Sequence, residues 1–298
     1  MQFENWASDE IQLARSAVAL KIPTPNSSMY KYISLDGKQS WNYFDRMLGE
    51  NKLYGSTLKS LNDPFEGSPY LIDDLSPSLI KRTIANNFDL AFRKHTGKPL
   101  PNFDDVETYR SEAINYLIKM LADYRVLAFC NRSDSPLLWS HYANSYKGAC
   151  LHFLGRSFRK IGFPRAKLGY VAYSDHRPNL PLSLALSMVQ KDVRNNKSFV
   201  MNRAELEKFC FFSKGLDWRY ENEIRAIYSA NETTNLEFHS DGLVSITLGP
   251  RMEQKEKDKL IKKVRNSKFK DIQIMDAKLS KNTFSVNSVY DDRWEQLT

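Results

Sequence analysis

The sequence has no stretch of about 18 consecutive apolar residues, the length that a membrane-spanning helix requires. Residues 1–22 are interrupted by acidic and basic side chains, so this segment matches neither a signal peptide nor a membrane anchor. With 42% hydrophobic and 26% charged residues, the composition is typical of a soluble globular protein. We therefore expect a cytoplasmic protein without a membrane partner.

Cysteine is scarce. Cys130, Cys150 and Cys210 are an odd number, have no C-x-x-C spacing and lie inside apolar runs. A disulfide framework needs paired cysteines, whereas isolated cysteines among apolar residues are typical of buried thiols in a reducing compartment. We expect three free, buried thiols.

The common cofactor motifs are also missing. The chain has no G-x-G-x-x-G, no G-x-x-x-x-G-K-[ST] and no H-E-x-x-H, so a dinucleotide would not be bound in the Rossmann manner. A triad built on Ser140 with His176 or His239 would lack a nucleophile elbow. A zinc site can also be drawn, but its spacing matches no usual finger. Its ligands would be Cys130, His141, Cys150 and His152.

Positive charge is concentrated near the C-terminal end. The 298-residue chain has a net charge of +8, and residues 251–270 contain nine Lys or Arg against three acids. Leu260, Ile261 and Val264 recur at helical spacing, which predicts an amphipathic surface helix with a lysine-rich solvent face. The alternative is an electrostatic contact surface for a polyanionic partner.

The order of apolar patterns predicts an α+β fold. We expect an N-terminal helix and link at residues 1–28, and a single domain at 29–298 with a helical insertion at about 75–123. Because short strands alternate irregularly with blocks of helices, we expect a mainly antiparallel sheet. Strands are predicted at 29–34, 52–58, 125–130, 149–153, 168–174, 221–228, 244–248 and 271–279. Helices are predicted at 1–20, 41–48, 78–94, 106–121, 136–143, 182–194, 199–212 and within 251–270.

One predicted strand carries an unusual set of charges. If residues 221–228 are extended, Glu221, Glu223 and Arg225 share one face, opposite Ile224 and its apolar neighbours. Two carboxylates beside a guanidinium suit a site that meets developing positive charge. The alternative is a solvated edge strand with a surface ion pair.

Four polar clusters within apolar surroundings resemble a known family. In order they read Y-K-Y at 30–32, N-D-P-F-E at 62–66, W-S-H-Y-A at 139–143 and W-x-Y-E-x-E-x-R at 218–225. This order resembles a widespread bacterial family of unknown function over about residues 29–250. The family is similar in layout to the ADP-ribosyltransferase superfamily, especially its branch that modifies nucleic acids. Some relatives of both occur in phage-defence or toxin loci.

The resemblance implies a split, mainly antiparallel sheet of ADP-ribosyltransferase-like type with NAD as a substrate in its cleft. Lys31 or Tyr32 would hold the dinucleotide, and Tyr54 or Tyr142 would stack on the nicotinamide. Glu223 would be the catalytic glutamate and Glu221 its partner toward the acceptor. The other residues that the resemblance assigns to dinucleotide binding are Tyr30, Asn62, Asp63, Ser140, His141 and Arg225.

This sequence departs from the superfamily at two places. The first strand lacks the usual Arg or His, and Ser56-Thr57 is only part of a Ser-Thr-Ser triplet. Which of Glu221 and Glu223 is essential therefore stays open at this point.

Each cluster also has a purely structural explanation. Tyr30 and Tyr32 can be core aromatics on either side of a surface lysine. The N-D-P sequence is typical of a turn, because Asn and Asp side chains bond their own backbone and Pro fixes φ. His141 can be a core histidine on an aromatic-lined helix.

Three functions fit these residues. The first is an ADP-ribosyltransferase-like toxin or antiviral defence effector that modifies a macromolecule, RNA or DNA among them, and has an antitoxin or other neutralising protein. The second is an inactive module of the same fold that binds nucleic acid through its basic segment, with a steep salt dependence. The third is a metal-dependent nuclease using Asp63, Glu66 and Glu221.

Overall fold

The computed structural model describes residues 20–83, 97, 99, 101–158, 166–189, 197–230 and 235–290. The chain divides into two compact units. The first unit comprises Met1–Leu20, Thr57–Tyr124 and Val171–Leu216, and the second comprises Lys21–Ser56, Arg125–Tyr170 and Asp217–Thr298. The segment predicted as a helical insertion, 75–123, falls in the first unit together with residues 171–216. The helix predicted for residues 1–20 lies outside the described residues except for Leu20.

The second unit is built on an eight-stranded sheet with the order β14-β13-β12-β5-β1-β4-β10-β6. β1 pairs antiparallel with β4 and β5, as do β12 with β5, β6 with β10, and β13 with β14, whereas β12 and β13 are parallel. The predicted α+β class with a mostly antiparallel sheet is thus confirmed. The strands are β1 (Ser28–Ile33), β4 (Tyr124–Cys130), β5 (Ala149–Leu154), β6 (Lys167–Tyr170), β10 (Glu223–Ser229), β12 (Leu243–Leu248), β13 (Gln273–Leu279) and β14 (Val286–Tyr290).

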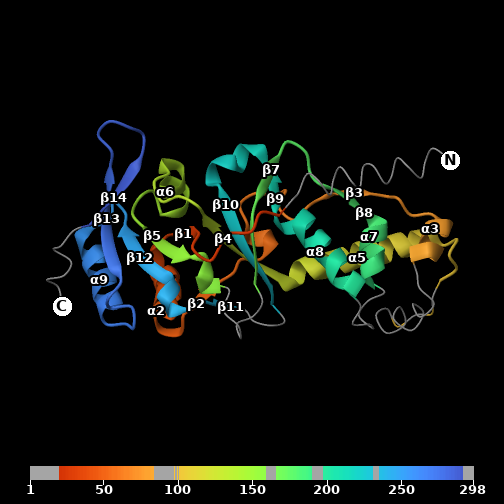
Figure 1. Ribbon diagram of the computed structural model, residues 1–298, viewed down its shortest axis with the longest axis horizontal. Helices are drawn as coiled ribbons and strands as arrows, with labels where there is room; N and C mark the ends of the chain where they lie inside the picture. Colours follow the sequence, from red (N-terminus) through yellow and green to blue (C-terminus); the bar gives the residue numbers. More distant parts are fainter. Residues whose placement is uncertain are drawn as a thin grey trace. The chain divides into compact units, whose positions relative to one another are not determined.

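Helices cover both faces of this sheet. α2 (Gly37–Glu50) and α9 (Gln254–Arg265) lie beside each other and pack into the main core with strand residues such as Met29 and Leu151 (Figure 1). α6 (Pro136–Tyr142) packs with Tyr32, whose side chain points to the opposite face because successive strand residues alternate. Each face of the sheet therefore has its own helices and its own hydrophobic cluster.

α9 confirms the predicted amphipathic surface helix. Leu260, Ile261 and Val264 are fully buried, while most of its lysines are exposed or partly exposed. Burial of this apolar stripe holds the helix on the sheet, since a helix of twelve residues is marginal by itself in water. Beside the main sheet, β2 (Lys52–Tyr54) pairs with β11 (Asn235–Glu237).

The first unit is mostly helical. α5 (Val106–Asp123) begins at Asp105, whose side chain accepts a hydrogen bond from the Thr108 backbone N–H, and it packs chiefly against α7 (Leu182–Val189). The other helices of this unit are α3 (Pro77–Thr83) and α8 (Lys197–Phe211). Two short parallel ribbons complete it: β3 (Tyr70–Ile72) with β8 (Asn179–Pro181), and β7 (Ala172–Ser174) with β9 (Ser213–Gly215).

Most predicted elements are present, with differences at their ends. The strand predicted at 168–174 is two strands, β6 and β7, which belong to different units. The strand predicted at 52–58 is β2 followed by a single bridge between Ser56 and Val126. Among the described helices, none has the length and apolar character that crossing a membrane requires.

Candidate functional site

The strand that carries the E-x-E-x-R motif lies inside the sheet. β10 has β4 on one side and β6 on the other, so it is not an edge strand. Glu223 and Arg225 point to the α6 face, while Ile224 and Ala226 point into the main core. Glu223 is 5% exposed and Arg225 is fully buried. The alternative of a solvated edge strand with a surface ion pair is therefore wrong.

Glu223 and Arg225 form a two-pronged ion pair. Arg225 Nε donates to Glu223 Oε1 at 2.7 Å, and a terminal guanidinium nitrogen donates to Oε2 at 2.9 Å. This parallel arrangement is the strongest form of a carboxylate–guanidinium contact and fixes the plane of both groups. Because an ion leaves water at great cost unless it is paired, the guanidinium keeps Glu223 ionised inside the protein.

Glu221 reaches the same region by a different route. It ends a 3-10 turn, Leu216–Glu221, and Asn222 has a positive φ of 45° before β10 begins at Glu223. The prediction of a continuous strand from Glu221 was wrong by two residues. Glu221 is nevertheless 4% exposed, and its Oε1 accepts a hydrogen bond from the Tyr142 hydroxyl of α6 at 2.5 Å.

Lys31 adds a cation from β1. Its ammonium donates to the Ala128 carbonyl at 3.2 Å and lies 5.6 Å from the centre of the Phe129 ring. Burial lowers the pKa of Lys31 to about 8, against the smaller opposing effects of Cys130 and the Glu223 carboxylate. The alternative interpretation, in which Lys31 is a surface lysine between two core tyrosines, is therefore wrong. The charge of Lys31 changes at about pH 8.

Cys130 lies close enough to Lys31, Glu221 and Glu223 to interact with their charges. The pKa of its thiol is raised to about 12, chiefly by burial, with smaller contributions from the carboxylates of Glu221 and Glu223 that raise it and from Lys31 that lowers it. The thiol is therefore protonated and is not a nucleophile. The charged groups come from strands that are neighbours in the sheet, β1, β4 and β10. We call Lys31, Tyr142, Glu221, Glu223 and Arg225 the carboxylate site.

The two tyrosines of the Y-K-Y motif lie on the α6 face in different environments. Tyr32 is buried, meets the Trp139 ring edge-on at 5.2 Å and donates its hydroxyl to the Arg132 carbonyl at 3.3 Å. Tyr30 is half-buried and stacks on His152 at 4.5 Å between ring centroids. Tyr32 is thus a core aromatic, as the structural explanation proposed, whereas Tyr30 presents part of its ring to solvent.

Further aromatic rings surround α6. His141 is exposed, so the alternative of a core histidine is wrong, and its ring lies 6.3 Å from both Tyr142 and Tyr220. Ser140 is half-buried on the same helix. Tyr220 was not among the predicted site residues, although its position immediately before Glu221 in the W-x-Y-E-x-E-x-R motif was a usable signal.

Tyr54 lies apart from the carboxylate site. It is 48% exposed on β2 and stacks on Tyr43 of α2 at 5.3 Å between ring centroids. Because α2 packs on the sheet face opposite α6, the structure does not bring Tyr54 together with Glu221 and Glu223. Of the two aromatics predicted to stack on a nicotinamide, Tyr142 is the one at the site.

Asn62 and Asp63 lie in the first unit. Asp63 is buried, and its Oδ1 accepts a hydrogen bond from the Phe65 backbone N–H at 2.9 Å, which confirms the predicted turn chemistry. In the same turn, Glu66 forms an ion pair with Lys214 of β9 at 3.1 Å, and both side chains are almost fully buried. The turn is therefore tied to β9 by a charge pair within this unit.

All three cysteines are free and buried, as predicted. Within the described ranges, no group of three or more His, Cys, Asp or Glu side chains is arranged to hold a metal ion. Neither the zinc set around Cys130 nor the nuclease set around Asp63 has such an arrangement.

The comparison with known families finds a domain of unknown function over the segment that holds the last two of the four motifs. Residues 138–226 match the family model described as a protein of unknown function, DUF2971. The matched segment begins in α6 and ends in β10, and it contains Tyr142, Glu221, Glu223 and Arg225. No curated protein and no solved structure matches the chain.

Proposed function

We propose that this chain is an ADP-ribosyltransferase-like enzyme that transfers ADP-ribose from NAD to a macromolecule. We further propose that it acts as a toxin or antiviral defence effector in a bacterial cytoplasm, where a neutralising protein controls it. The observation that carries the proposal is the buried Glu223 carboxylate, locked by Arg225, with a second buried carboxylate, Glu221, two residues away.

The chemistry needs a fixed negative charge. Breaking the bond between ribose and nicotinamide leaves positive charge on the ribose, as in glycoside hydrolysis, and a preorganised carboxylate shielded from water stabilises that charge. Arg225 keeps Glu223 ionised and holds its plane, so Arg225 acts as a positioning residue and not as a dinucleotide contact. The nicotinamide leaves with the bonding electrons, and the nucleophile of the acceptor bonds to the ribose carbon.

Glu221 suits the acceptor side of the reaction. Its Oε1 accepts a hydrogen bond from the Tyr142 hydroxyl, which orients the carboxylate. An oriented carboxylate within hydrogen-bond reach of a nucleophile can act as a general base. Glu221 would therefore take the proton that the acceptor nucleophile loses.

The surrounding residues fit the parts of NAD. The pyrophosphate needs a cation, and Lys31 is protonated below about pH 8. The nicotinamide and adenine rings need flat apolar surfaces, which the half-buried rings of Tyr30, Tyr142 and Tyr220 offer. These are the contacts that we assign to the dinucleotide, with Tyr30, Tyr142 and Tyr220 on the α6 face.

The sheet topology supports the finer fold assignment. The register between β1 and β4 contains one residue pair, Tyr30 with Cys130, although both strands are longer. Limited pairing at this point would let the sheet separate into two halves with the carboxylate site at the division. We therefore propose a split sheet of ADP-ribosyltransferase type.

The test is a mass-spectrometric assay of nicotinamide release and of labelled ADP-ribose transfer. Purified protein is incubated with NAD and separate pools of RNA, DNA and cell protein. Glu223→Gln, which keeps the shape but removes the charge, should reduce release by about a hundred- to a thousandfold, the order of effect of losing one preorganised electrostatic group. Circular dichroism and thermal melting establish that the variant is folded. Release that persists in a folded Glu223→Gln protein contradicts the proposal.

The same assay also tests a second candidate function. The lysine-rich α9 favours a module of the same fold that binds nucleic acid without turnover. Folded wild-type protein that releases no nicotinamide in any pool, yet binds nucleic acid, would support this second function in place of the first.

A further inference from the structure

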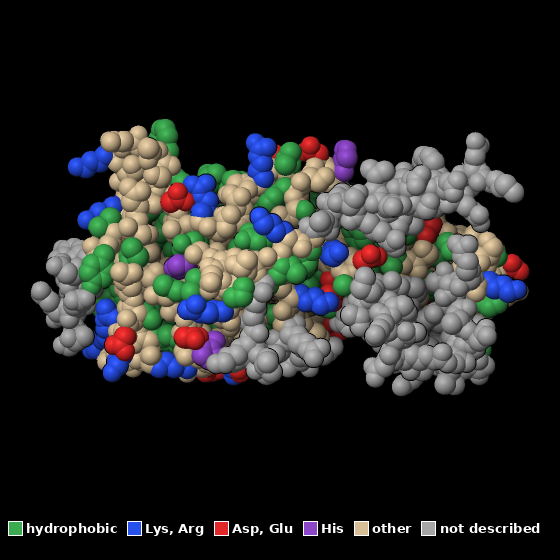
Figure 2. Space-filling model, in the orientation of Figure 1, with side chains coloured by type: hydrophobic (Ala, Val, Ile, Leu, Met, Phe, Trp, Pro, Cys, Tyr) green, Lys and Arg blue, Asp and Glu red, His purple; other side chains and the backbone are tan. Residues whose placement is uncertain are grey.

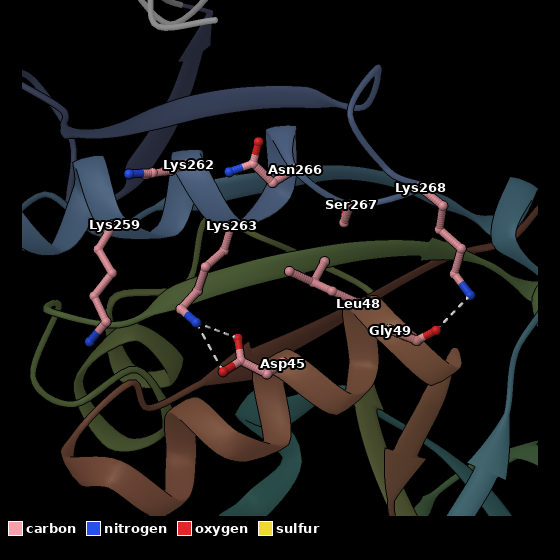
Figure 3. A pocket seen from close by; sticks show the side chains of 9 residues that line it. All are labelled: Asp45, Leu48, Gly49, Lys259, Lys262, Lys263, Asn266, Ser267 and Lys268. Atoms are coloured by element: carbon pink, nitrogen blue, oxygen red, sulfur yellow. Dashed lines mark hydrogen bonds and ion pairs between the residues drawn. The ribbon is translucent and has the colours of Figure 1, made fainter.

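A groove runs between α2 and α9 on the sheet face opposite α6. It has a volume of about 750 Å³ and lies entirely within the second unit (Figure 3). We call it the lysine groove. Its lining residues are Asp45, Leu48 and Gly49 of α2, together with Lys259, Lys262, Lys263, Asn266, Ser267 and Lys268 of α9 and the turn after it.

Three of the lysines project from the α9 side toward α2, as Figure 3 shows. The Lys259 ammonium lies 3.8 Å from the centre of the Trp41 ring, and the Lys263 ammonium bonds both carboxylate oxygens of Asp45 at 2.7 and 2.9 Å. Lys268 donates to the Gly49 carbonyl at 3.1 Å. Their α2 partners are spaced four residues apart, so the three cations extend over about 12 Å of helix length.

The groove has a net positive charge even after the ion pairs among its own residues are taken into account. One carboxylate, Asp45, lines it against four lysines. Asp45 offsets the charge of Lys263, and Glu256 lies 3.4 Å from Lys259. Lys268 bonds only a neutral carbonyl there, and within the described part of the chain Lys262 has no hydrogen-bond or ion-pair partner. Lys262 and Lys268 are therefore exposed cations without a neutralising carboxylate.

We propose that the lysine groove binds the phosphodiester backbone of a nucleic acid strand. A polyanion presents several phosphates in a row, which suits cations spread over about 12 Å better than one small anion does. The described lining contains no arginine that could read a base edge by a paired contact. Trp41 is buried beneath Lys259, so no aromatic ring of the groove is open for base stacking. The contact is therefore expected to be independent of base sequence.

The surface around the groove is consistent with electrostatic attraction. In Figure 2, Lys and Arg side chains border the α9 region at the lower left, with a few acidic side chains among them. Exposed lysines of this kind contribute to affinity by releasing counterions from the phosphates, which makes the binding depend on salt. This site would hold the macromolecular acceptor of the proposed transferase, but the binding itself does not require that reaction.

The test measures fluorescence anisotropy of two labelled 12-nucleotide RNAs of unrelated sequence, with full-length protein and no NAD. The groove variant is Lys262→Glu with Lys268→Glu. The control variant, Lys278→Glu with Lys281→Glu, changes the net charge equally and alters exposed lysines of the β13–β14 hairpin. Equal net charge keeps long-range attraction the same in both variants.

We expect the groove variant to bind both RNAs at least tenfold more weakly than wild type, and the control to change affinity less than twofold. The slope of log affinity against log salt should fall by about 1.4 in the groove variant, roughly 0.7 for each lost phosphate contact on a single strand. Equal weakening in both variants, or no weakening in the groove variant, overturns the proposal.

Two further measurements distinguish nucleic acid from other anionic partners, and distinguish a failure of the groove proposal from a failure of the proposed reaction. Binding to vesicles with anionic lipid that depends on the groove, without binding to RNA, would overturn the nucleic-acid assignment, as would full displacement of RNA by micromolar pyrophosphate. Nicotinamide release is measured in the groove variant with NAD alone. If wild type binds RNA through the groove but releases no nicotinamide, the proposed reaction is refuted and the groove proposal stands. If wild type releases nicotinamide but its RNA binding does not depend on the groove, the groove proposal is refuted and the reaction stands.

Discussion

The Glu223–Arg225 pair of the carboxylate site and the lysine groove lie on opposite faces of one sheet and use charge in opposite ways. Glu223 and Arg225 are buried and fixed by two short hydrogen bonds, whereas Lys262 is exposed and Lys268 has one bond to a neutral carbonyl. A buried pair is expensive to break and suits directed chemistry, because its geometry is fixed before the substrate arrives. Exposed lysines stabilise the fold little and suit a loose, salt-sensitive contact.

The largest effect on stability is expected at Arg225. Arg225→Met leaves the Glu223 carboxylate buried without its guanidinium, which should lower the free energy of unfolding by about 3–5 kcal/mol in urea titration. The matched control is Arg225→Met with Glu223→Leu, which removes both charges and should recover much of the loss. If the double variant is as unstable as the single one, the two residues are not a coupled pair.

A smaller effect is expected at Tyr142. Tyr142→Phe removes the hydroxyl that donates to the buried Glu221, and a hydrogen bond to a charged group contributes about 1.5–3 kcal/mol. Tyr142 is partly exposed, so water can replace part of this bond and the lower end of the range is expected. Thermal unfolding at neutral pH measures the effect. Tyr43→Phe, an exposed tyrosine of α2, serves as the control and should change stability less.

The pH dependence of the proposed reaction tests whether Lys31 acts through its positive charge. A lysine is charged below its pKa, so the Lys31 cation is present below about pH 8 and is lost as the pH rises through that value. NAD turnover should fall above pH 8, by about tenfold per pH unit at the high end. Lys31→Arg retains a cation and should extend turnover to higher pH. Identical pH profiles for wild type and Lys31→Arg would refute a charge role for this residue.

The smallest effect is expected in the lysine groove. Lys262→Gln removes an exposed charge, and a surface substitution of this kind usually changes the free energy of unfolding by less than about 0.5 kcal/mol. RNA affinity should nevertheless fall by a few fold, because one phosphate contact is lost. Urea titration and anisotropy on the same preparation measure the two quantities. A stability loss above about 1 kcal/mol would show that Lys262 has a structural role.

Local patterns in the sequence were sufficient for much of the carboxylate site. Alternation placed Glu223 and Arg225 on one strand face and Ile224 on the other, and the structure agrees. It could not show that Asn222 adopts a positive φ and that the strand begins only at Glu223, which leaves Glu221 in the preceding turn. Nor could it show that β1, β4 and β10 are neighbours, because sheet order depends on contacts between residues far apart in the chain. The meeting of Lys31 with Cys130 and Glu223 follows from that order.

Only one wall of the lysine groove could be predicted from the sequence. The helical spacing of Leu260, Ile261 and Val264 predicted α9 and its lysine-rich face. Its partner wall, α2, is more than 200 residues away in the chain, and the contact between Lys263 and Asp45 has no local signature. The short strands of the first unit, such as β3 and β8, were missed because three residues are too few to show a period.

The most direct test compares nicotinamide release by wild type, Glu223→Gln and the Lys262→Glu/Lys268→Glu variant, with NAD alone and equal amounts of folded protein. We predict that wild type and the groove variant release nicotinamide at similar rates, and that Glu223→Gln releases almost none while retaining wild-type affinity for RNA. Release by Glu223→Gln at the wild-type rate, or none by wild type, would contradict the assignment of the chemistry to the carboxylate site.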